Sequence, residues 1–181
     1  MAATVSRVTT DNIRACIRDV ANFPKPGVTF KDITPLLLDA ALFRRAVELM
    51  AAPFAQRGAS RVVSIESRGF LLGAPIALAL EAGLVPIRKP GKLPAARDRV
   101  EYALEYGVDA LEMHRDAVGP GDRVLIVDDV LATGGTAAGA AQLVRGQGAA
   151  VLGLTFLIEL DFLKGREKLA GERVEALLHY T

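Results

Sequence analysis

The feature that most restricts the fold is a helix-to-strand order that recurs along the chain. Three segments with apolar residues at helical spacing each stop at a glycine, and an apolar, strand-like run follows directly. The helical segments are 39–57, 70–82 and 137–147, the glycines are Gly58, Gly83 and Gly148, and the strands are 61–65, 84–87 and 151–158. We expect each glycine to take the left-handed conformation that follows a helix. Helices alternating with apolar strands predict an α/β protein whose mainly parallel central sheet is flanked by helices.

Two segments depart from this order. A helix is predicted over 11–20, and a loop over 22–32, which contains two prolines and a glycine. Segment 89–98 is also rich in proline and glycine, and the alternating apolar residues over 100–106 predict a half-exposed strand or hairpin. Because a long insertion in a compact domain is usually functional, we expect this region to form a mobile lid over the active site.

Composition narrows the class of protein. The 181 residues suit a single domain, and 22 basic against 21 acidic side chains leave a net charge of +1, which argues against a nucleic-acid partner. Cys16 is the only cysteine, so it cannot form an intrachain disulfide, and with two distant histidines it makes no zinc site. The first twenty residues carry several charges, and no apolar run reaches the length of a membrane span. We therefore expect a soluble cytoplasmic protein without a signal peptide or a membrane partner.

Segment 124–136 (Val-Leu-Ile-Val-Asp-Asp-Val-Leu-Ala-Thr-Gly-Gly-Thr) carries the clearest chemistry. It predicts a strand that ends in two carboxylates, then a small-residue loop leading into a helix. The N–H groups at a helix start favour a bound phosphate, and Gly134 and Gly135 allow the backbone to approach it closely. Asp128 and Asp129 would repel a phosphate and instead suit sugar hydroxyls or a hydrated Mg²⁺. Because neighbouring strand residues point to opposite faces, both carboxylates reach one ligand only where the chain leaves the extended conformation.

Two other phosphate motifs do not fit this segment. A nucleoside-triphosphate loop requires a lysine after its glycines, and a dinucleotide fingerprint requires a different glycine spacing. The segment instead resembles the phosphoribosyl pyrophosphate (PRPP) signature of the type I phosphoribosyltransferases. That resemblance implies a type I phosphoribosyltransferase fold, in which the two aspartates hold the ribose hydroxyls. The same aspartates would also bind Mg²⁺ through water. The loop that wraps the 5′-phosphate then comprises Ala132, Thr133, Gly134, Gly135 and Thr136.

A second group of residues suits a pyrophosphate. Ser67 and Arg68 directly follow strand 61–65, at the sheet edge where ligands of α/β proteins bind. By resemblance to the family this turn is the pyrophosphate loop, often with a strained peptide bond; the plain alternative is a surface arginine in a turn. Further along, a basic loop contains Arg88, Lys89 and Lys92, and suits pyrophosphate capture better than RNA binding because it lacks interleaved aromatics. In the family, side chains of this region reach across a homodimer interface.

Two further segments resemble the adenine phosphoribosyltransferases in particular. Segment 102–107 is similar to their mobile-loop motif, which implies a catalytic role for Glu105, although a solvent-facing edge residue is the alternative. Segment 23–32 is similar to their N-terminal base pocket, which implies that Phe30 packs on the purine while Thr29 and Lys31 lie near its edge. Lys31 stands where many members have arginine. Segment 163–169 also resembles the family's C-terminal part.

The resemblance thus predicts a single domain with a hood segment of about 1–36 and a core of about 37–181. The implied reaction joins adenine to PRPP and yields AMP and pyrophosphate, as in purine salvage. Two alternatives stay open: a phosphoribosyltransferase for a 6-oxopurine (xanthine or hypoxanthine), and a PRPP-sensing regulator without turnover.

Overall fold

The computed structural model describes residues 9–103 and 108–181, and the chain divides into two compact units, Met1–Leu49 and Met50–Thr181. The first unit contains helix α1 (Thr10–Ala15), an antiparallel pair of strands β1 (Arg18–Ala21) and β2 (Thr29–Asp32), and helix α2 (Thr34–Leu38). Helix α3 (Ala40–Ala51) runs across the boundary between the units. It begins where predicted, since the Asp39 carboxylate accepts hydrogen bonds from the N–H groups of Ala41 and Leu42.

The sequence prediction for the first unit was partly wrong. The expected helix over 11–20 ends at Ala15, and the expected loop over 22–32 contains strand β2. Pairing between the two short strands explains both errors, because Arg18 at the start of β1 lies opposite Asp32 at the end of β2 and forms a 2.6 Å ion pair with it. Such a long-range pairing overrides local helix propensity.

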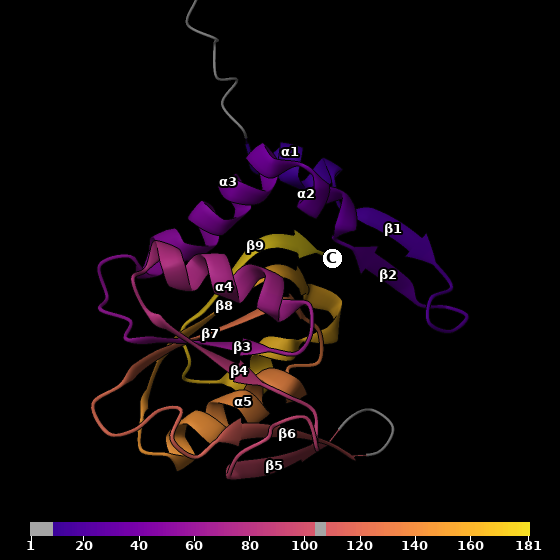
Figure 1. Ribbon diagram of the computed structural model, residues 1–181. Helices are drawn as coiled ribbons and strands as arrows, with labels where there is room; N and C mark the ends of the chain where they lie inside the picture. The colour runs from indigo at the N-terminus through magenta and orange to yellow at the C-terminus, as the bar shows by residue number, and fades with distance from the viewer. Residues whose placement is uncertain (1–8, 104–107) are drawn as a thin grey trace, which may run out of the picture. The chain divides into compact units, whose positions relative to one another are not determined.

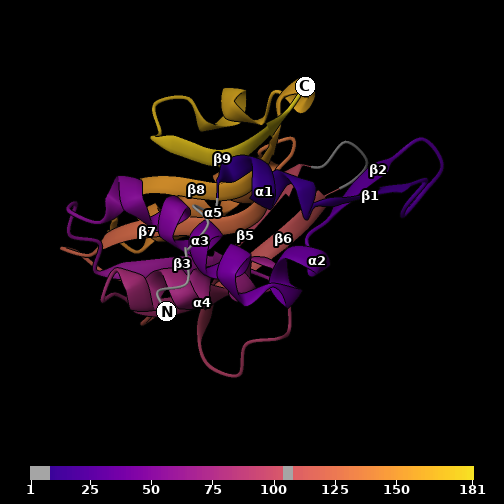
Figure 2. The ribbon, with the colours of Figure 1, turned by 90° about the horizontal axis from the view of Figure 1, so that it is seen from above.

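The second unit is built on a five-stranded, wholly parallel sheet with the order β4-β3-β7-β8-β9. The strands are β3 (Arg61–Ile65), β4 (Gly83–Ile87), β7 (Arg123–Leu131), β8 (Ala150–Leu160) and β9 (Val174–Tyr180). Figure 2 shows β3, β7, β8 and β9 side by side in this order. The predicted parallel α/β architecture is therefore confirmed.

Helices and a hairpin cover the two faces of this sheet. Helix α4 (Gly69–Ala79) lies on one face, and helix α5 (Gly135–Gly146) lies on the other with the antiparallel hairpin β5 (Arg97–Ala103) and β6 (Val108–His114) beside it (Figure 1). Three short 3-10 turns complete the unit: η1 (Ala52–Phe54), η2 (Asp161–Leu163) and η3 (Gly165–Leu169). Successive strand residues point to opposite faces, so Val63 and Ile65 join the α5 side of the core while Ser64 lies against Gly73 of α4.

The glycines after the helices behaved as predicted in two cases. Gly58 and Gly148 have φ of +64° and +83°, whereas after α4 it is Glu81, with φ of +53°, that takes the left-handed conformation. Gly83 serves a different purpose, because a Cβ there would lie 3.1 Å from the Arg61 side chain on the neighbouring strand. Among the described residues, no helix is both long enough and apolar enough to cross a lipid bilayer.

Candidate active site

The acidic pair lies at the carboxyl end of β7 in the centre of the sheet. The Asp128 carboxylate accepts a hydrogen bond of 2.9 Å from the Asp129 N–H, and the Asp129 carboxylate forms a 2.9 Å ion pair with Nε of Arg68. Burial raises the pKa of both carboxyl groups; repulsion from Asp129 adds to this effect at Asp128, while Arg68 opposes it at Asp129. One arginine therefore does not fully compensate the negative charge of the two carboxylates. Their environment favours the binding of a further cation or of several hydroxyl donors.

The sequence predicted that the strand ends at the aspartates, and this prediction was wrong. β7 continues to Leu131, and Val130 and Leu131 pair with Ile158 and Glu159 of β8. Asp129 is consequently buried, with 5% of its surface exposed, whereas Asp128 is half-buried on the other face of the strand. The strand is longer than predicted because two apolar residues, Val130 and Leu131, follow the acidic pair and continue the pairing with β8.

The loop after β7 forms a pocket of about 70 Å³ at the start of α5. Its lining includes Asp128 and Phe156 as well as the loop itself, which consists of Ala132, Thr133, Gly134, Gly135 and Thr136. The first hydrogen bond of α5 runs from the Ala138 N–H to the Gly134 carbonyl. The N–H groups of the first turn therefore have no acceptor within the helix, which makes this end of α5 suitable for an anion.

Gly134 is required at this junction for two reasons. Its φ of +78° is left-handed, and a Cβ on it would collide with the carbonyl oxygen of Gly165 in η3. A Cβ on Gly165 would in turn collide with the Ala132 carbonyl. Next to Gly165, Arg166 donates three hydrogen bonds of 2.7 to 2.9 Å to the Glu159 carboxylate of β8, which fixes η3 against the sheet.

The turn from β3 to α4 reaches the same edge of the sheet, because β3 pairs in parallel with β7. Ser67 and Arg68 lie in this turn, and the Glu66–Ser67 peptide bond is cis. At Gly69 a Cβ would lie 2.8 Å from Oδ1 of Asp128, so the turn can pass this close to the acidic pair only with glycine there. The structure thus brings together the two parts of the site that the sequence predicted separately.

The three predicted pyrophosphate cations are held by carboxylates. Arg88 Nε lies 3.0 Å from the Glu66 carboxylate, which Lys92 also contacts, while Lys89 contacts Asp109. Burial alone would raise the pKa of Glu66, but hydrogen bonds from Lys92, the Lys89 N–H and Arg88 hold that pKa at about 2. The basic loop is therefore fastened to the end of β3 by an ionised glutamate.

The residues predicted to surround the base belong to the first unit. Phe30 lies edge-on against Phe23, with ring centroids 5.1 Å apart, and the Lys31 ammonium forms a 2.7 Å ion pair with Asp19. Thr29 is the first residue of β2. Glu105, the predicted catalytic residue, lies outside the described residues.

Sequence reasoning missed several residues of this region. Glu66 was recognised only as part of a motif, and nothing local in the sequence indicated that Asp109 or Tyr102 would meet Lys89. Gly165 was noted only within a C-terminal segment, although a glycine beside an arginine in an otherwise irregular stretch could have suggested a close backbone contact. These contacts join segments far apart in the chain, so no local pattern encodes them.

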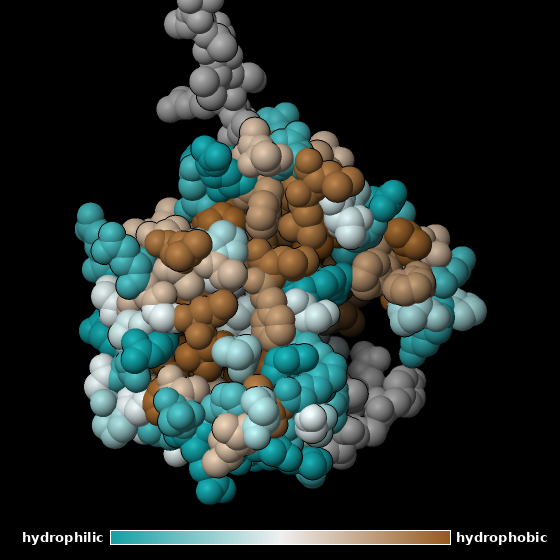
Figure 3. All heavy atoms as spheres, in the orientation of Figure 1, coloured by the Kyte–Doolittle hydropathy of each residue, from teal (hydrophilic) through white to brown (hydrophobic). Residues whose placement is uncertain are grey.

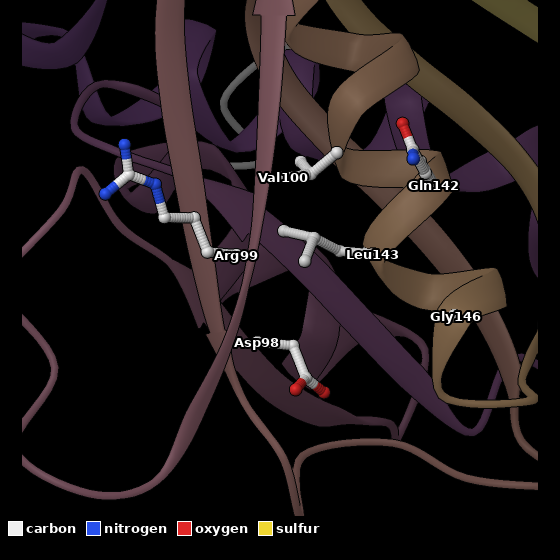
Figure 4. Close-up of a pocket in the computed structure, with 6 residues that line it drawn as sticks. All are labelled: Asp98, Arg99, Val100, Gln142, Leu143 and Gly146. Carbon is white, nitrogen blue, oxygen red and sulfur yellow. The ribbon is translucent and has the colours of Figure 1, made fainter.

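A second depression lies away from this chemistry. It has a volume of about 270 Å³ and is formed by the first residues of β5 and the last turns of α5, including Asp98, Val100 and Leu143 (Figure 4). The pocket formed by residues 132–136, the segment predicted to be the phosphate loop, lies at the opposite end of α5. We therefore take the carboxyl edge of the sheet, and not this larger depression, as the candidate active site.

Comparison with known proteins agrees with this geometry. The family model of the phosphoribosyl transferase domain matches residues 40–173. The chain therefore belongs to the phosphoribosyltransferase family.

Its relatives within that family narrow the group. The adenine phosphoribosyltransferase of Myxococcus xanthus is 56% identical over 169 residues, which cover 93% of this chain and 92% of the relative. That of Anaeromyxobacter dehalogenans strain 2CP-C is 55% identical and covers 94% of this chain and 99% of the relative. The crystal structure of the Thermoanaerobacter pseudethanolicus enzyme superposes with a TM-score of 0.93 at 49% identity, covering 95% of this chain and all of that one. Within its family this chain belongs with the adenine phosphoribosyltransferases.

Proposed function

We propose that this protein transfers the phosphoribosyl group of PRPP to adenine, giving AMP and pyrophosphate in purine salvage. The observation that carries the proposal is the meeting of Asp128 and Asp129, the Gly134 loop and Arg68 at one edge of the sheet. The aspartates hold the ribose hydroxyls, the loop and the α5 N-terminus hold the 5′-phosphate, and the turn at Ser67 and Arg68 holds pyrophosphate.

The reaction breaks the bond between C1 of the ribose and the pyrophosphate oxygen, which keeps the electron pair. Adenine N9 supplies the pair for the new bond to C1 and loses its proton. The basic residues Arg68, Arg88, Lys89 and Lys92 stabilise the negative charge that collects on pyrophosphate. The negative charge of the aspartates stabilises the positive charge that develops on the ribose.

Mg²⁺ fits this site as an outer-sphere partner of Asp128 and Asp129. Desolvation raises the pKa of both carboxyl groups, and in the part of the chain that the structure describes Arg68 is the cation paired with them, so additional positive charge would stabilise their ionised forms. When bound with the substrate, the metal would neutralise phosphate oxygens and strengthen pyrophosphate as a leaving group. Binding through water suits Mg²⁺, which dehydrates reluctantly.

For the acceptor base, we assign the pocket to Thr29, Phe30 and Lys31 of the hood segment. The yeast relative, 40% identical with a TM-score of 0.87, was crystallised with adenine, which supports an adenine site. We assign Glu105 as the residue that exchanges a proton with the base, so Glu105→Gln should lower kcat with little change in KM. A change confined to KM would instead make Glu105 a binding residue.

We further propose that the enzyme is a homodimer in the cytoplasm. Helix α4 has apolar residues on all sides, and Leu71 and Leu78 on α4, with Leu84 on β4, are 47%, 81% and 45% exposed. Figure 3 shows hydrophobic residues on the face of the molecule that carries α4. A helix that is apolar all round is normally covered, and a second copy of the chain would cover this one.

A cytoplasmic location suits substrates that are charged phosphate esters, and fractionation of cells would test it.

The deciding experiment measures pyrophosphate release from PRPP with adenine, hypoxanthine, guanine and xanthine in parallel, with and without Mg²⁺. We expect release with adenine only, and only with the metal. Because a base pocket that pairs one hydrogen-bond pattern leaves its groups unpaired with another, discrimination by about 10⁴ is attainable. Preference for a 6-oxopurine would change the acceptor, and PRPP binding without release would favour a regulator.

A further inference from the structure

The Lys89 ammonium is held by a pair of side chains on the β5–β6 hairpin. It contacts the Asp109 carboxylate and donates a hydrogen bond of 3.0 Å to the Tyr102 hydroxyl, which in turn donates one of 3.1 Å to the same carboxylate. The ammonium also lies 5.6 Å from the centre of the Tyr102 ring. Burial alone would lower the pKa of Lys89, but Asp109 and Tyr102 raise it, so the lysine is charged here.

Tyr102 connects this ion pair to the phosphate loop. Thr136 donates a hydrogen bond of 3.3 Å to the Tyr102 hydroxyl, and a Cβ on Gly139 of α5 would lie 3.2 Å from the Tyr102 ring. Tyr102 is 9% exposed, so its position is fixed by packing. The Tyr102 hydroxyl therefore links the Lys89 ammonium to the loop that we assign to the 5′-phosphate, because it accepts a hydrogen bond from both Lys89 and Thr136.

We propose that Asp109 is a resting partner for the Lys89 ammonium, which PRPP or pyrophosphate must displace before Lys89 can bind their phosphates. The proposal rests on the proposed function. Asp109 then competes directly with the diphosphate for one cation. It weakens binding of PRPP and speeds the loss of pyrophosphate after transfer. Asp109 is a residue that tunes affinity and does not touch the reacting atoms.

Asp109 suits this role better than Glu66, the carboxylate that contacts Arg88 and Lys92. Glu66 accepts a hydrogen bond from the Lys89 backbone N–H as well as from the Arg88 and Lys92 side chains, so it also shapes the loop. Within residues 9–103 and 108–181, the Asp109 carboxylate contacts the side chains of Lys89 and Tyr102 and accepts a hydrogen bond from the N–H of its neighbour Ala110. The Lys89 and Asp109 side chains are 35% and 30% exposed, so the pair can separate without opening the core.

The test is calorimetric titration of the full-length protein with PRPP in the presence of Mg²⁺. Asp109→Asn should bind PRPP about two- to fivefold more tightly, the range expected when a partly exposed ion pair no longer competes. Lys89→Met should bind it more weakly. In the Lys89→Met background, Asp109→Asn should have no further effect, because the cation for which it competes is gone.

Glu101→Gln is the matched control, since it removes the same charge from the same hairpin while Glu101 pairs with Arg99. Equal tightening by Glu101→Gln, or tightening by Asp109→Asn that persists without Lys89, would show a general charge effect and overturn the proposal. Unchanged or weaker binding by Asp109→Asn would also overturn it, and Asp109→Ser repeats the measurement if the asparagine variant does not fold. Absence of PRPP binding by the unaltered protein would reject the proposed function itself.

Discussion

At the scale of single residues, two carboxyl groups of the site lower the stability of the folded protein. Asp129 is buried and Asp128 is half-buried beside Arg68, and loss of solvent raises the pKa of both carboxyl groups. A carboxyl whose pKa is raised by folding contributes stability below its unfolded value of 3.8, and loses it as pH rises through the folded value. At neutral pH the ionised pair therefore lowers the free energy of unfolding.

This argument predicts the behaviour of Asp128→Asn. The amide oxygen can still accept the Asp129 N–H bond, so the fold is retained, and the variant should be more stable than the original at pH 7. The advantage should fade as pH falls below about 4. PRPP should bind at least about tenfold more weakly, since hydrogen bonds from hydroxyls to a charged group are lost. Urea unfolding at several pH values and PRPP titration would check both effects; lower stability with unchanged affinity would contradict the assignment.

The pKa of Glu66 is shifted in the opposite direction, so this carboxylate stabilises the fold at neutral pH. Its pKa of about 2 lies below the ordinary glutamate value of 4.5, so its stabilising effect is present above pH 4.5 and is lost as pH falls towards 2. Glu66→Gln should lose at most about 3 kcal/mol at neutral pH, and less in practice because Arg88 and Lys92 are partly exposed and screened. Unfolding curves of the two proteins should converge in acid. A constant difference down to pH 2 would show that shape, not charge, matters at this position.

At the scale of structural elements, the parts set by local patterns were predictable and those set by distant partners were not. Strand β3 was predicted with its observed bounds, and the predicted helical segment that begins at Asp39 matches the start of α3. The short strands β1 and β2 were missed because only their mutual pairing defines them. In the site, the acidic pair and the phosphate loop could be found from residue types, whereas the Glu66 and Asp109 ion pairs depend on loop geometry that spacing does not encode.

The junction of the phosphate loop with α5 gives a matched test within one element. Gly134→Ala should cost about 1–3 kcal/mol, because alanine is strained at positive φ and would meet the Gly165 carbonyl. Gly146→Ala, near the other end of the helix with open space around it, should instead gain about 0.5–1 kcal/mol. Urea unfolding of both variants and PRPP titration would measure this. Equal stability of the two variants would mean that the backbone at Gly134 is not constrained.

At the scale of the whole molecule, the exposed apolar face of α4 and β4 bears on assembly. Leu78→Glu should convert the proposed dimer into a monomer, because a charge would have to be buried in the interface. Leu38→Glu is the control, since Leu38 is similarly exposed, at 88% against 81%, and belongs to the first unit. Sedimentation velocity would distinguish the two states. A dimer that survives Leu78→Glu would place the interface elsewhere.

The neighbouring positions of β3 and β7 at the middle of the sheet also bear on how such enzymes diverge. Both strands bring polar residues to one edge, so the proposed sites for the sugar and its phosphates lie together at the middle of the sheet. The proposed acceptor pocket belongs to the other unit of the chain. Selection for a new nucleobase can therefore reshape the first unit while the inherited chemistry of the second unit stays intact.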